Sequence, residues 1–358
     1  MRYSKRELNG LPVPEEIVIS NLSKYIALFA DGKYDGFLFR GENTNYNSTV
    51  SSALRSYQPT PENLHDKYPF IKMKDEFKRE VSHMINSDEH ESFLAFSQHY
   101  GIPTNLVDFT KSPLVALYFA CQPFNSVDKK FDNTRGFVYL MPNDLIDITD
   151  IIEKHEDENI LNLLVSKDSE VLVEFYKKIV SYRQNHPSKF QAYFKKLVEE
   201  YDYHFKEIFL SVGTDLSLPE KKKARETIQK QCIHICDDSL EYVSLAYAFL
   251  KNIIEYDAVV WWINGIPNFT YTPILSFERG RNQQGLFVYQ AFLSFIEGAY
   301  DAPIVSQQRI WPDKIIVVEN KKQILKELDR IGINDKFIYG DYDSIARYIR
   351  EKYISKST

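Results

Sequence analysis

Cysteine is scarce in this chain of 358 residues, and the few that occur lack the spacing of a metal site or a disulfide framework. The three cysteines are Cys121, Cys232 and Cys236. Cys232 and Cys236 lie four residues apart on a predicted helix, and His234 between them lies on a different face of it. The three side chains are therefore not expected to bind one metal ion together. Free thiols of this kind fit a reducing cytoplasm.

Long apolar runs and an excess of basic residues are missing as well. The N-terminal stretch MRYSKRELNGLPVPEEI contains no apolar signal core, and charges interrupt the longest hydrophobic segments. The formal net charge is -6, which gives no long-range attraction to nucleic acid or to an anionic membrane. We therefore expect a soluble, cytoplasmic protein without a membrane partner.

Several common catalytic motifs are absent from the sequence. There is no P-loop (GxxxxGK[ST]), no GxGxxG after a predicted strand, and no HExxH, CxxC or GxSxG. The sequence therefore does not support assignment to the standard types of ATPase, Rossmann dehydrogenase, zinc protease or serine hydrolase. No acidic pair stands out for glycoside hydrolysis, and we predict no metal site.

Aromatic residues, by contrast, are abundant, with 24 tyrosines and 24 phenylalanines. Such side chains suit both hydrophobic cores and pockets for planar ligands. Short strand-like segments recur without regular single-helix crossovers, which favours an α+β fold over a doubly wound sheet. The predicted strands are FLFRG and residues 135–141, 257–263, 271–277, 284–290 and 314–320.

Helical periodicity predicts helices over residues 14–30, 74–86 and 90–100, a buried one from Ser112 onward, and two near the C-terminus. Gly101 is placed to end the third of these in a left-handed conformation. Ser112 and Pro113 make a favourable helix start, with serine as the N-cap and proline in the first turn.

Charged runs divide the chain into segments. EKHEDEN, KKLVEEYDYHFKE and PEKKKARE indicate helices with solvated faces, so we assign residues 146–256 to a helical insertion or subdomain. Residues 1–32 are assigned to an N-terminal helical segment. The two remaining blocks, 33–145 and 257–358, carry the candidate site residues.

The first candidate site is FLFRGEN, where an arginine and a glycine end a predicted strand. Alternation along the strand places Arg40 on the face opposite Phe37 and Phe39. If both faces are covered, Arg40 points into a cleft, and Gly41 lets a ligand or backbone approach closely. A guanidinium there suits a bidentate grip on phosphate or carboxylate, with a structural ion pair as the open alternative.

The second candidate is QHYGIPTNLVDFT, residues 98–110, which concentrates polar groups between two apolar helices. His99 and Tyr100 lie at a helix end, and Asp108 and Thr110 lie in the turn before the next helix. Buried polar groups need partners, so the cluster either locks this loop or lines a polar pocket. The density of polar groups favours the pocket.

The third candidate is SFERGRNQQGLFVYQ, in which Glu278 precedes two arginines and Gln284 opens a strand. Glu278 is a candidate general base or electrostatic stabiliser, although surface pairing with Arg279 or Arg281 is the more common fate of such a carboxylate.

These segments, in this order, resemble the FRG domain family. Phe39-Arg40-Gly41 matches its aromatic-Arg-Gly motif, QHYGIPTNLVDFTKSPLVALYFA at 98–120 is similar to its longest signature, and RNQQGLF resembles a later element. The resemblance makes residues 33–145 and 257–358 the two parts of an FRG domain. Many members have arginine where this chain has Asn105, so an anion held there needs another donor.

The FRG resemblance implies a bacterial or phage-linked protein of toxin or defence systems. Its first motif also resembles that of ADP-ribosyltransferases, which implies a mixed, mainly antiparallel split sheet flanked by helices. NAD would then be the substrate, cleaved at the nicotinamide–ribose bond, with a protein or nucleic acid as the modified target. The helical insertion would offer a surface to an antitoxin or defence partner.

By the same likeness Arg40 grips the NAD phosphates beside Gly41, and Tyr100 or Phe109 stacks on nicotinamide. Asp108 or Glu278 supplies the carboxylate that stabilises an oxocarbenium-like state. Gln284 takes the late-strand position, where an amide can orient a nucleophile but cannot accept a proton as a carboxylate does. His99 and Thr110 complete the predicted site.

Two other functions stay open. One is a non-catalytic module that senses a nucleotide or a partner in a defence system. The other is a nuclease-like toxin, which the acidic net charge and the lack of a carboxylate cluster for two-metal chemistry disfavour.

Overall fold

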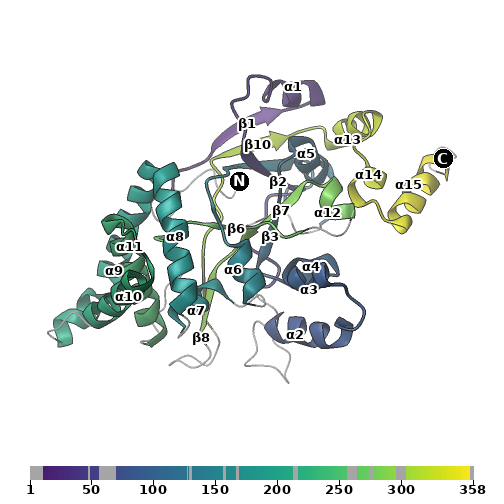
Figure 1. Cartoon of the computed structure of the whole chain (residues 1–358). Coiled ribbons are helices and arrows are strands. Elements are labelled where there is room, and N and C mark those ends of the chain that lie inside the picture. The colour runs from purple at the N-terminus through teal and green to yellow at the C-terminus, as the bar shows by residue number, and fades with distance from the viewer. Residues whose placement is uncertain are drawn as a thin grey trace.

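The computed structural model describes residues 11–46, 49–55, 70–126, 128, 131–155, 159–166, 169–212, 217–255, 264–274, 278–295 and 304–354. An eight-stranded sheet lies at its centre, in the order β1-β10-β4-β2-β3-β7-β6-β5 (Figure 1). Its strands are β1 (Glu15–Ile19), β2 (Phe37–Glu42), β3 (Leu106–Thr110), β4 (Gly136–Pro142), β5 (Ile146–Asp147), β6 (Phe269–Tyr271), β7 (Gly285–Tyr289) and β10 (Lys314–Val318). β8 (Phe292–Phe295) and β9 (Ile304–Gln307) form a separate antiparallel pair.

Helices flank this sheet. They are α1 (Leu22–Ala27), α2 (Phe70–Val81), α3 (Ser87–Glu91), α4 (Phe93–His99), α5 (Pro113–Cys121), α6 (Thr149–Lys154), α7 (Ile160–Val165), α8 (Ser169–Asn185), α9 (Pro187–Val212), α10 (Ser217–Gln231), α11 (Asp237–Glu255), α12 (Glu278–Asn282), α13 (Lys321–Arg330), α14 (Asp335–Tyr339) and α15 (Tyr342–Ile354). Figure 1 shows α8 to α11 gathered at one side of the molecule and α13 to α15 at the other. In the described residues, no helix combines the length and apolar character that crossing a bilayer requires.

The fold is α+β, as predicted, and its sheet is mixed and mainly antiparallel. The parallel pairs are β1 with β10 and β5 with β6, while the other neighbours in the sheet run antiparallel. β2 pairs with β4 along its whole length, from Phe37 to Glu42, but meets β3 only at Phe39 and Thr110. The sheet is therefore split between β2 and β3, and this split positions the candidate site.

Three sequence-based expectations of secondary structure are wrong. The predicted helix holding Cys232 and Cys236 is absent, because both cysteines lie in the segment between α10 and α11. The predicted helix at 14–30 is a strand over Glu15–Ile19, because three consecutive β-branched residues pair in parallel with β10 and only then does α1 begin. The turn predicted to hold Asp108 and Thr110 is strand β3, whose ladder with β7 runs from Leu106 to Thr110. The predicted strand at 257–263 lies outside the described residues, and the one at 271–277 is described only to 274, with strand geometry ending at Tyr271.

Helix α5 packs against the sheet with its backbone in direct contact. Six of its nine residues are buried, as its apolar sequence predicts. A Cβ atom at Gly41 of β2 would lie 1.9 Å from the carbonyl oxygen of Ala116, and one at Gly136 of β4 would lie 2.0 Å from that of Ala120. Both glycines are therefore required by helix–sheet packing, and Gly41 allows the close approach of α5.

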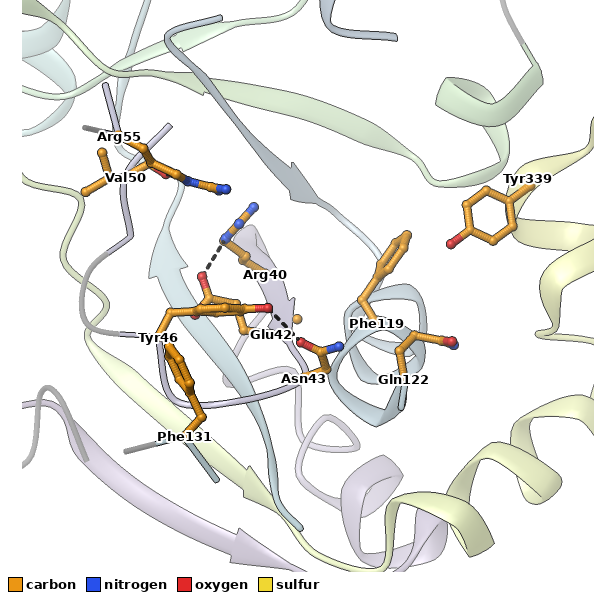
Figure 2. A pocket seen from close by; sticks show the side chains of 11 residues that line it. Arg40, Glu42, Asn43, Tyr46, Val50, Arg55, Phe119, Gln122, Phe131 and Tyr339 are labelled. Atoms are coloured by element: carbon orange, nitrogen blue, oxygen red, sulfur yellow. Dashed lines mark hydrogen bonds and ion pairs between the residues drawn. The ribbon is translucent and has the colours of Figure 1, made fainter. Parts of the chain in front are cut away.

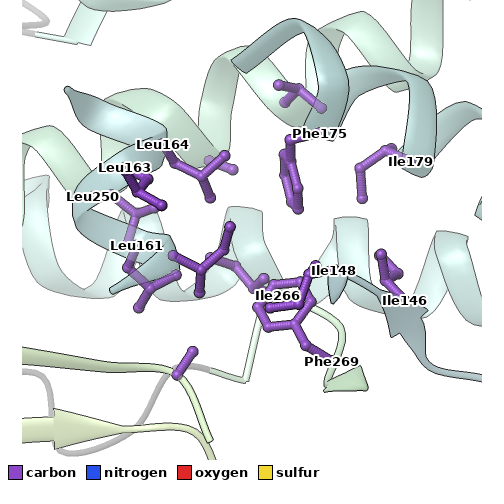
Figure 3. Close-up of a cluster of buried hydrophobic side chains, with 14 of the residues drawn as sticks. Ile146, Ile148, Leu161, Leu163, Leu164, Phe175, Ile179, Leu250, Ile266 and Phe269 are labelled. Carbon is purple, nitrogen blue, oxygen red and sulfur yellow. The ribbon is translucent and has the colours of Figure 1, made fainter. Parts of the chain in front are cut away.

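The helices between residues 149 and 255 share one hydrophobic cluster with the far end of the sheet. Figure 3 shows Phe175 of α8 and Phe269 of β6 pointing into this cluster, with their ring centroids 6.2 Å apart. Leu161 of α7 and Leu250 of α11 are fully buried in it. The charged faces read from the sequence are the outer faces of these helices, because their apolar faces are packed here.

A half-buried carboxyl group joins α9 to the segment that leads into β6. Glu200 accepts hydrogen bonds from the backbone N–H groups of Asn264 (3.1 Å) and Gly265 (3.0 Å). Helix and segment are close enough that a Cβ at Gly265 would lie 2.7 Å from Cα of Leu197. Burial raises the pKa of Glu200 to about 7, against the two backbone hydrogen bonds, which lower it.

Glu200 should make the protein less stable as the pH rises from about 4.5 to about 7. In that interval the folded protein holds a proton that the unfolded chain has released, so the free energy of unfolding falls by about 3 kcal/mol. Thermal unfolding at pH 5 and pH 8 should show this loss in the wild type and a much smaller one in Glu200→Gln. Glu199→Gln, at an exposed neighbouring carboxylate, should behave as the wild type; equal pH dependence in all three proteins would contradict the assignment.

Candidate functional site

Arg40 bridges the split in the sheet. Its Nη1 donates to the carbonyl oxygen of Asp108 on β3 at 2.9 Å, where a regular β2–β3 ladder would have supplied a backbone donor. Its Nε donates to Oε1 of Glu42 at 3.1 Å, and the Glu42 side chain is only 4% exposed. The sequence left two alternatives for Arg40, a structural ion pair and a side chain that points into a cleft. The structure shows both features, because Arg40 pairs with Glu42 and also lines a cavity.

That cavity has a volume of about 670 Å³ and is called the Arg40 cavity below. Its lining combines cationic, amide and aromatic side chains; it consists of Arg40, Gly41, Glu42, Asn43, Tyr46, Val50, Arg55, Phe119, Gln122, Phe131 and Tyr339 (Figure 2). The hydroxyl of Tyr46 donates to Oδ1 of Asn43 at 3.2 Å. Two guanidinium groups with several rings are what a ligand carrying phosphates and planar bases requires.

Two smaller cavities continue from it along β3. The first, of about 230 Å³, shares Arg40, Val50 and Arg55 with the Arg40 cavity and also reaches Gln98 and Asp108. The second, of about 140 Å³, shares Gln98 and Asp108 with the first and is lined further by His99, Phe109, Arg279 and Gln283, among others. The arginine motif and the QHYG corner therefore line adjoining cavities, with Asp108 between them.

The side chain of Asp108 is held in place by Gln98, the first residue of the motif QHYGIPTNLVDFT. Nε2 of Gln98 donates to Oδ1 of Asp108 at 2.8 Å, and Oε1 of Gln98 accepts a hydrogen bond from the hydroxyl of Thr104. The carboxylate is exposed, whereas the neighbouring Val107 and Phe109 are buried. The strand alternation that sequence reasoning missed is what turns the Asp108 side chain out of the core.

The helix end before this loop has the predicted geometry. Gly101 has φ +89° and its N–H donates to Gln98, while the N–H of Ile102 donates to Ser97, so α4 ends in a Schellman motif. His99 is half-buried beside Tyr100, and burial, followed by the charge of Arg279, lowers its pKa. His99 is therefore largely neutral at pH 7.

The predicted nicotinamide-stacking residues lie in different surroundings. Tyr100 is 61% exposed and packs on Phe96 and Phe77, away from Arg40. Phe109 is buried in a core cluster with Leu38 and also borders the smallest cavity. The rings that line the Arg40 cavity itself belong to residues that sequence reasoning did not single out.

Thr110, Glu278 and Gln284 lie at the margin of the site. The hydroxyl of Thr110 donates to the carbonyl of Gln283 at 2.6 Å and accepts from the N–H of Ser112, so it anchors the start of α5. Glu278 is exposed at the start of α12, beside Gly340. Gln284 is also exposed and adopts φ +46°, and its carbonyl accepts from the N–H of Lys111.

Most of the lining residues were missed in the sequence, for different reasons. Glu42 was within reach, because it follows Arg40 by two positions and so shares its face of β2. Tyr46 and Arg55 lie in a stretch, NTNYNSTVSSALRS, that has no periodic pattern to place it. Asn105 is a buried amide that donates to the carbonyl of Gln290 at 3.2 Å, so the second cation of the site is Arg55.

No group of three or more histidine, cysteine, aspartate or glutamate side chains is placed to hold a metal ion in the part of the chain that the structure describes. Residues 35–129 match the family model of the FRG domain. Neither the curated proteins nor the solved structures compared with the chain gave a match. The matched segment begins just before β2 and ends after α5, and thus contains Arg40, the Schellman corner and Asp108: the chain carries an FRG domain.

Proposed function

We propose that the FRG domain binds NAD in the Arg40 cavity and its two continuations, and cleaves the bond between nicotinamide and ribose. The observation that carries this proposal is the lining of adjoining cavities by two arginines, several aromatic rings and one exposed carboxylate, Asp108. A dinucleotide needs these groups in this combination: cations for its pyrophosphate, rings for its bases and a negative charge near the reacting ribose.

The arginines would hold the pyrophosphate. Arg40 is oriented by Glu42 and by the carbonyl of Asp108, so little side-chain freedom is lost when an anion binds. Arg55 is exposed and, among the described residues, makes one long hydrogen bond, from Nε to the carbonyl of Val50 at 3.4 Å, so its guanidinium is available to a phosphate. Tyr46, Phe119 and Phe131 would contact one base.

Asp108 would act at the other end of the ligand. When the bond from C1′ of the ribose to the pyridinium nitrogen breaks, its electron pair leaves with nicotinamide, which departs as a neutral molecule. The carboxylate of Asp108 would stabilise the cation that develops at C1′. The oxygen of a water or of a target hydroxyl then forms a bond to C1′, which neutralises the cation. Its proton is released to Asp108 or to solvent.

The test is nicotinamide release from NAD by the purified chain. Asp108→Asn keeps the acceptor for Gln98 but removes the charge, so turnover should fall by about 100-fold or more while NAD affinity stays within about threefold. Asp343→Asn, at an exposed carboxylate of α15, is the control and should keep full turnover. Turnover that survives in Asp108→Asn would remove Asp108 from the mechanism.

A non-catalytic nucleotide- or partner-sensing module is the second candidate. It is favoured by the positions of Glu278 and Gln284, which are exposed beside α14 and before β7 rather than in the lining of the Arg40 cavity. Saturable NAD binding without nicotinamide release would support it. The toxin or phage-defence role, the protein or nucleic-acid target, and an antitoxin or defence partner bound through residues 146–256 stay proposals that rest on family resemblance.

A further inference from the structure

A second large cavity lies beyond the wall of the Arg40 cavity and is called the Lys321 cavity below. It has a volume of about 700 Å³ and shares no lining residue with the Arg40 cavity. Its lining comes from the end of α5, the segment between α5 and β4, and the start of α13, and it includes Phe124, Arg135, Glu319, Lys321 and Lys322.

Lys321 is a buried cation whose partners are incomplete. Its side chain is 7% exposed, and its Nζ donates to the carbonyl oxygen of Asn43 at 2.8 Å. Within the described residues no carboxylate lies within ion-pairing distance of it, so only one of its three donors has a partner. Burying an ammonium with a single neutral acceptor is unfavourable, and burial accordingly lowers its pKa.

The rest of the lining adds positive charge. Lys322 is exposed next to Lys321, and Arg135 is held by Asp132 through a 2.5 Å bond from Nε to Oδ2. Glu319 is the single carboxylate in this lining, against three cations. Asp132 neutralises Arg135, so Lys321 and Lys322 outweigh Glu319 and the cavity is weakly positive in a chain whose net charge is -6.

The cations also meet the start of a helix. α13 begins at Lys321, and its N-cap, Asn320, has a left-handed conformation and makes no side-chain capping bond. The free N–H groups and positive dipole end of a helix start attract anions. Phe124 supplies a ring and Asn125 and Asn133 supply amides, which suit the base and sugar of a nucleotide.

We propose that the Lys321 cavity is a second ligand site, which takes a nucleoside phosphate with its phosphate on Lys321, Lys322 and Arg135. The site is independent of the proposed NAD chemistry, because its lining is separate from that of the Arg40 cavity. A bound phosphate would give Lys321 a direct ion-pair partner, which no described residue provides, since Asp132 acts on it only through longer-range attraction.

Isothermal titration with AMP and with inorganic phosphate tests the site. Lys321→Met should fold, because methionine keeps the length of the stem and removes a buried charge, and it should bind AMP about tenfold more weakly or worse. Lys322→Glu, an exposed substitution that leaves the core alone, should lose binding to a similar degree. Lys326→Ala, on the exposed side of α13, should bind as the wild type.

The result separates this site from the Arg40 cavity. AMP binding that persists in Arg55→Ala and is lost in Lys322→Glu supports the proposal; the reverse pattern, or no binding of either probe to the wild type, overturns it. If AMP and inorganic phosphate bind equally well, the ligand is recognised as a free phosphate. If AMP binds more tightly, it is recognised as a nucleotide.

Discussion

Gly41→Ala is expected to yield no folded protein, whereas Gly285→Ala is expected to leave the fold unchanged. A Cβ at position 41 would lie 1.9 Å from the carbonyl oxygen of Ala116 and 2.8 Å from the backbone nitrogen of Ala120. Both atoms belong to the main chain of α5, so relief requires the helix to move off the sheet, at a cost above about 3 kcal/mol. Soluble yield and thermal unfolding measure the outcome.

Gly285 is the matched control because it also lies in the central sheet and its φ is not in the left-handed region. A Cβ there would meet its nearest atom, the carbonyl oxygen of Gly280, at 3.6 Å, which is ordinary contact. Soluble Gly41→Ala protein that melts like the wild type would show that α5 does not sit this close to β2. The position of Arg40, which follows from that packing, would then also be in doubt.

Arg40→Ala is expected to lower stability and to abolish NAD binding together. It removes the guanidinium from a Glu42 side chain that is 4% exposed, and it leaves the Asp108 carbonyl without its cross-strand donor. Breaking a buried ion pair in this way costs about 3 kcal/mol. Differential scanning calorimetry and titration with NAD give the two readouts.

Two further variants separate the structural and binding roles of Arg40. Arg40→Met with Glu42→Gln removes both charges, so it should recover most of the lost stability and still fail to bind NAD. Arg55→Ala removes an exposed arginine from the same cavity, so it should melt like the wild type and bind about tenfold more weakly. Tight NAD binding by the double variant would mean that Arg40 is a structural clamp alone.

The sequence predicts correctly those parts of the fold that depend on interactions between residues close together in the chain. The Gly101 helix end and the Ser112-Pro113 helix start were both predicted, because each depends on side chains within a few residues. The strands at 15–19 and 106–110 were not predicted. Their partners lie far along the chain, at 314–318 and 285–289, and the pairing overrides an ambiguous local pattern.

The site was predictable to a similar degree. Arg40 and Asp108 stand in motifs, and the structure brings them to adjoining cavities. Glu278 was a candidate only because it is acidic and close to a strand, and nothing in the sequence states that α12 turns it toward Gly340. Arg55 lies in an aperiodic stretch, so only the folded chain shows that it shares a cavity with Arg40.

The split in the sheet has a consequence for synthesis on the ribosome. When residues up to about 145 have emerged, β2 and β4 can already pair, but β3 touches this unit at one residue pair and its main partner, β7, begins at Gly285. The edge of β3 that later pairs with β7 therefore stays unpaired while the helices from α6 to α11 are translated, and it can pair with other chains during that time. Shielding of the nascent segment that holds β3 by a chaperone would therefore lower the risk of aggregation until β7 is made.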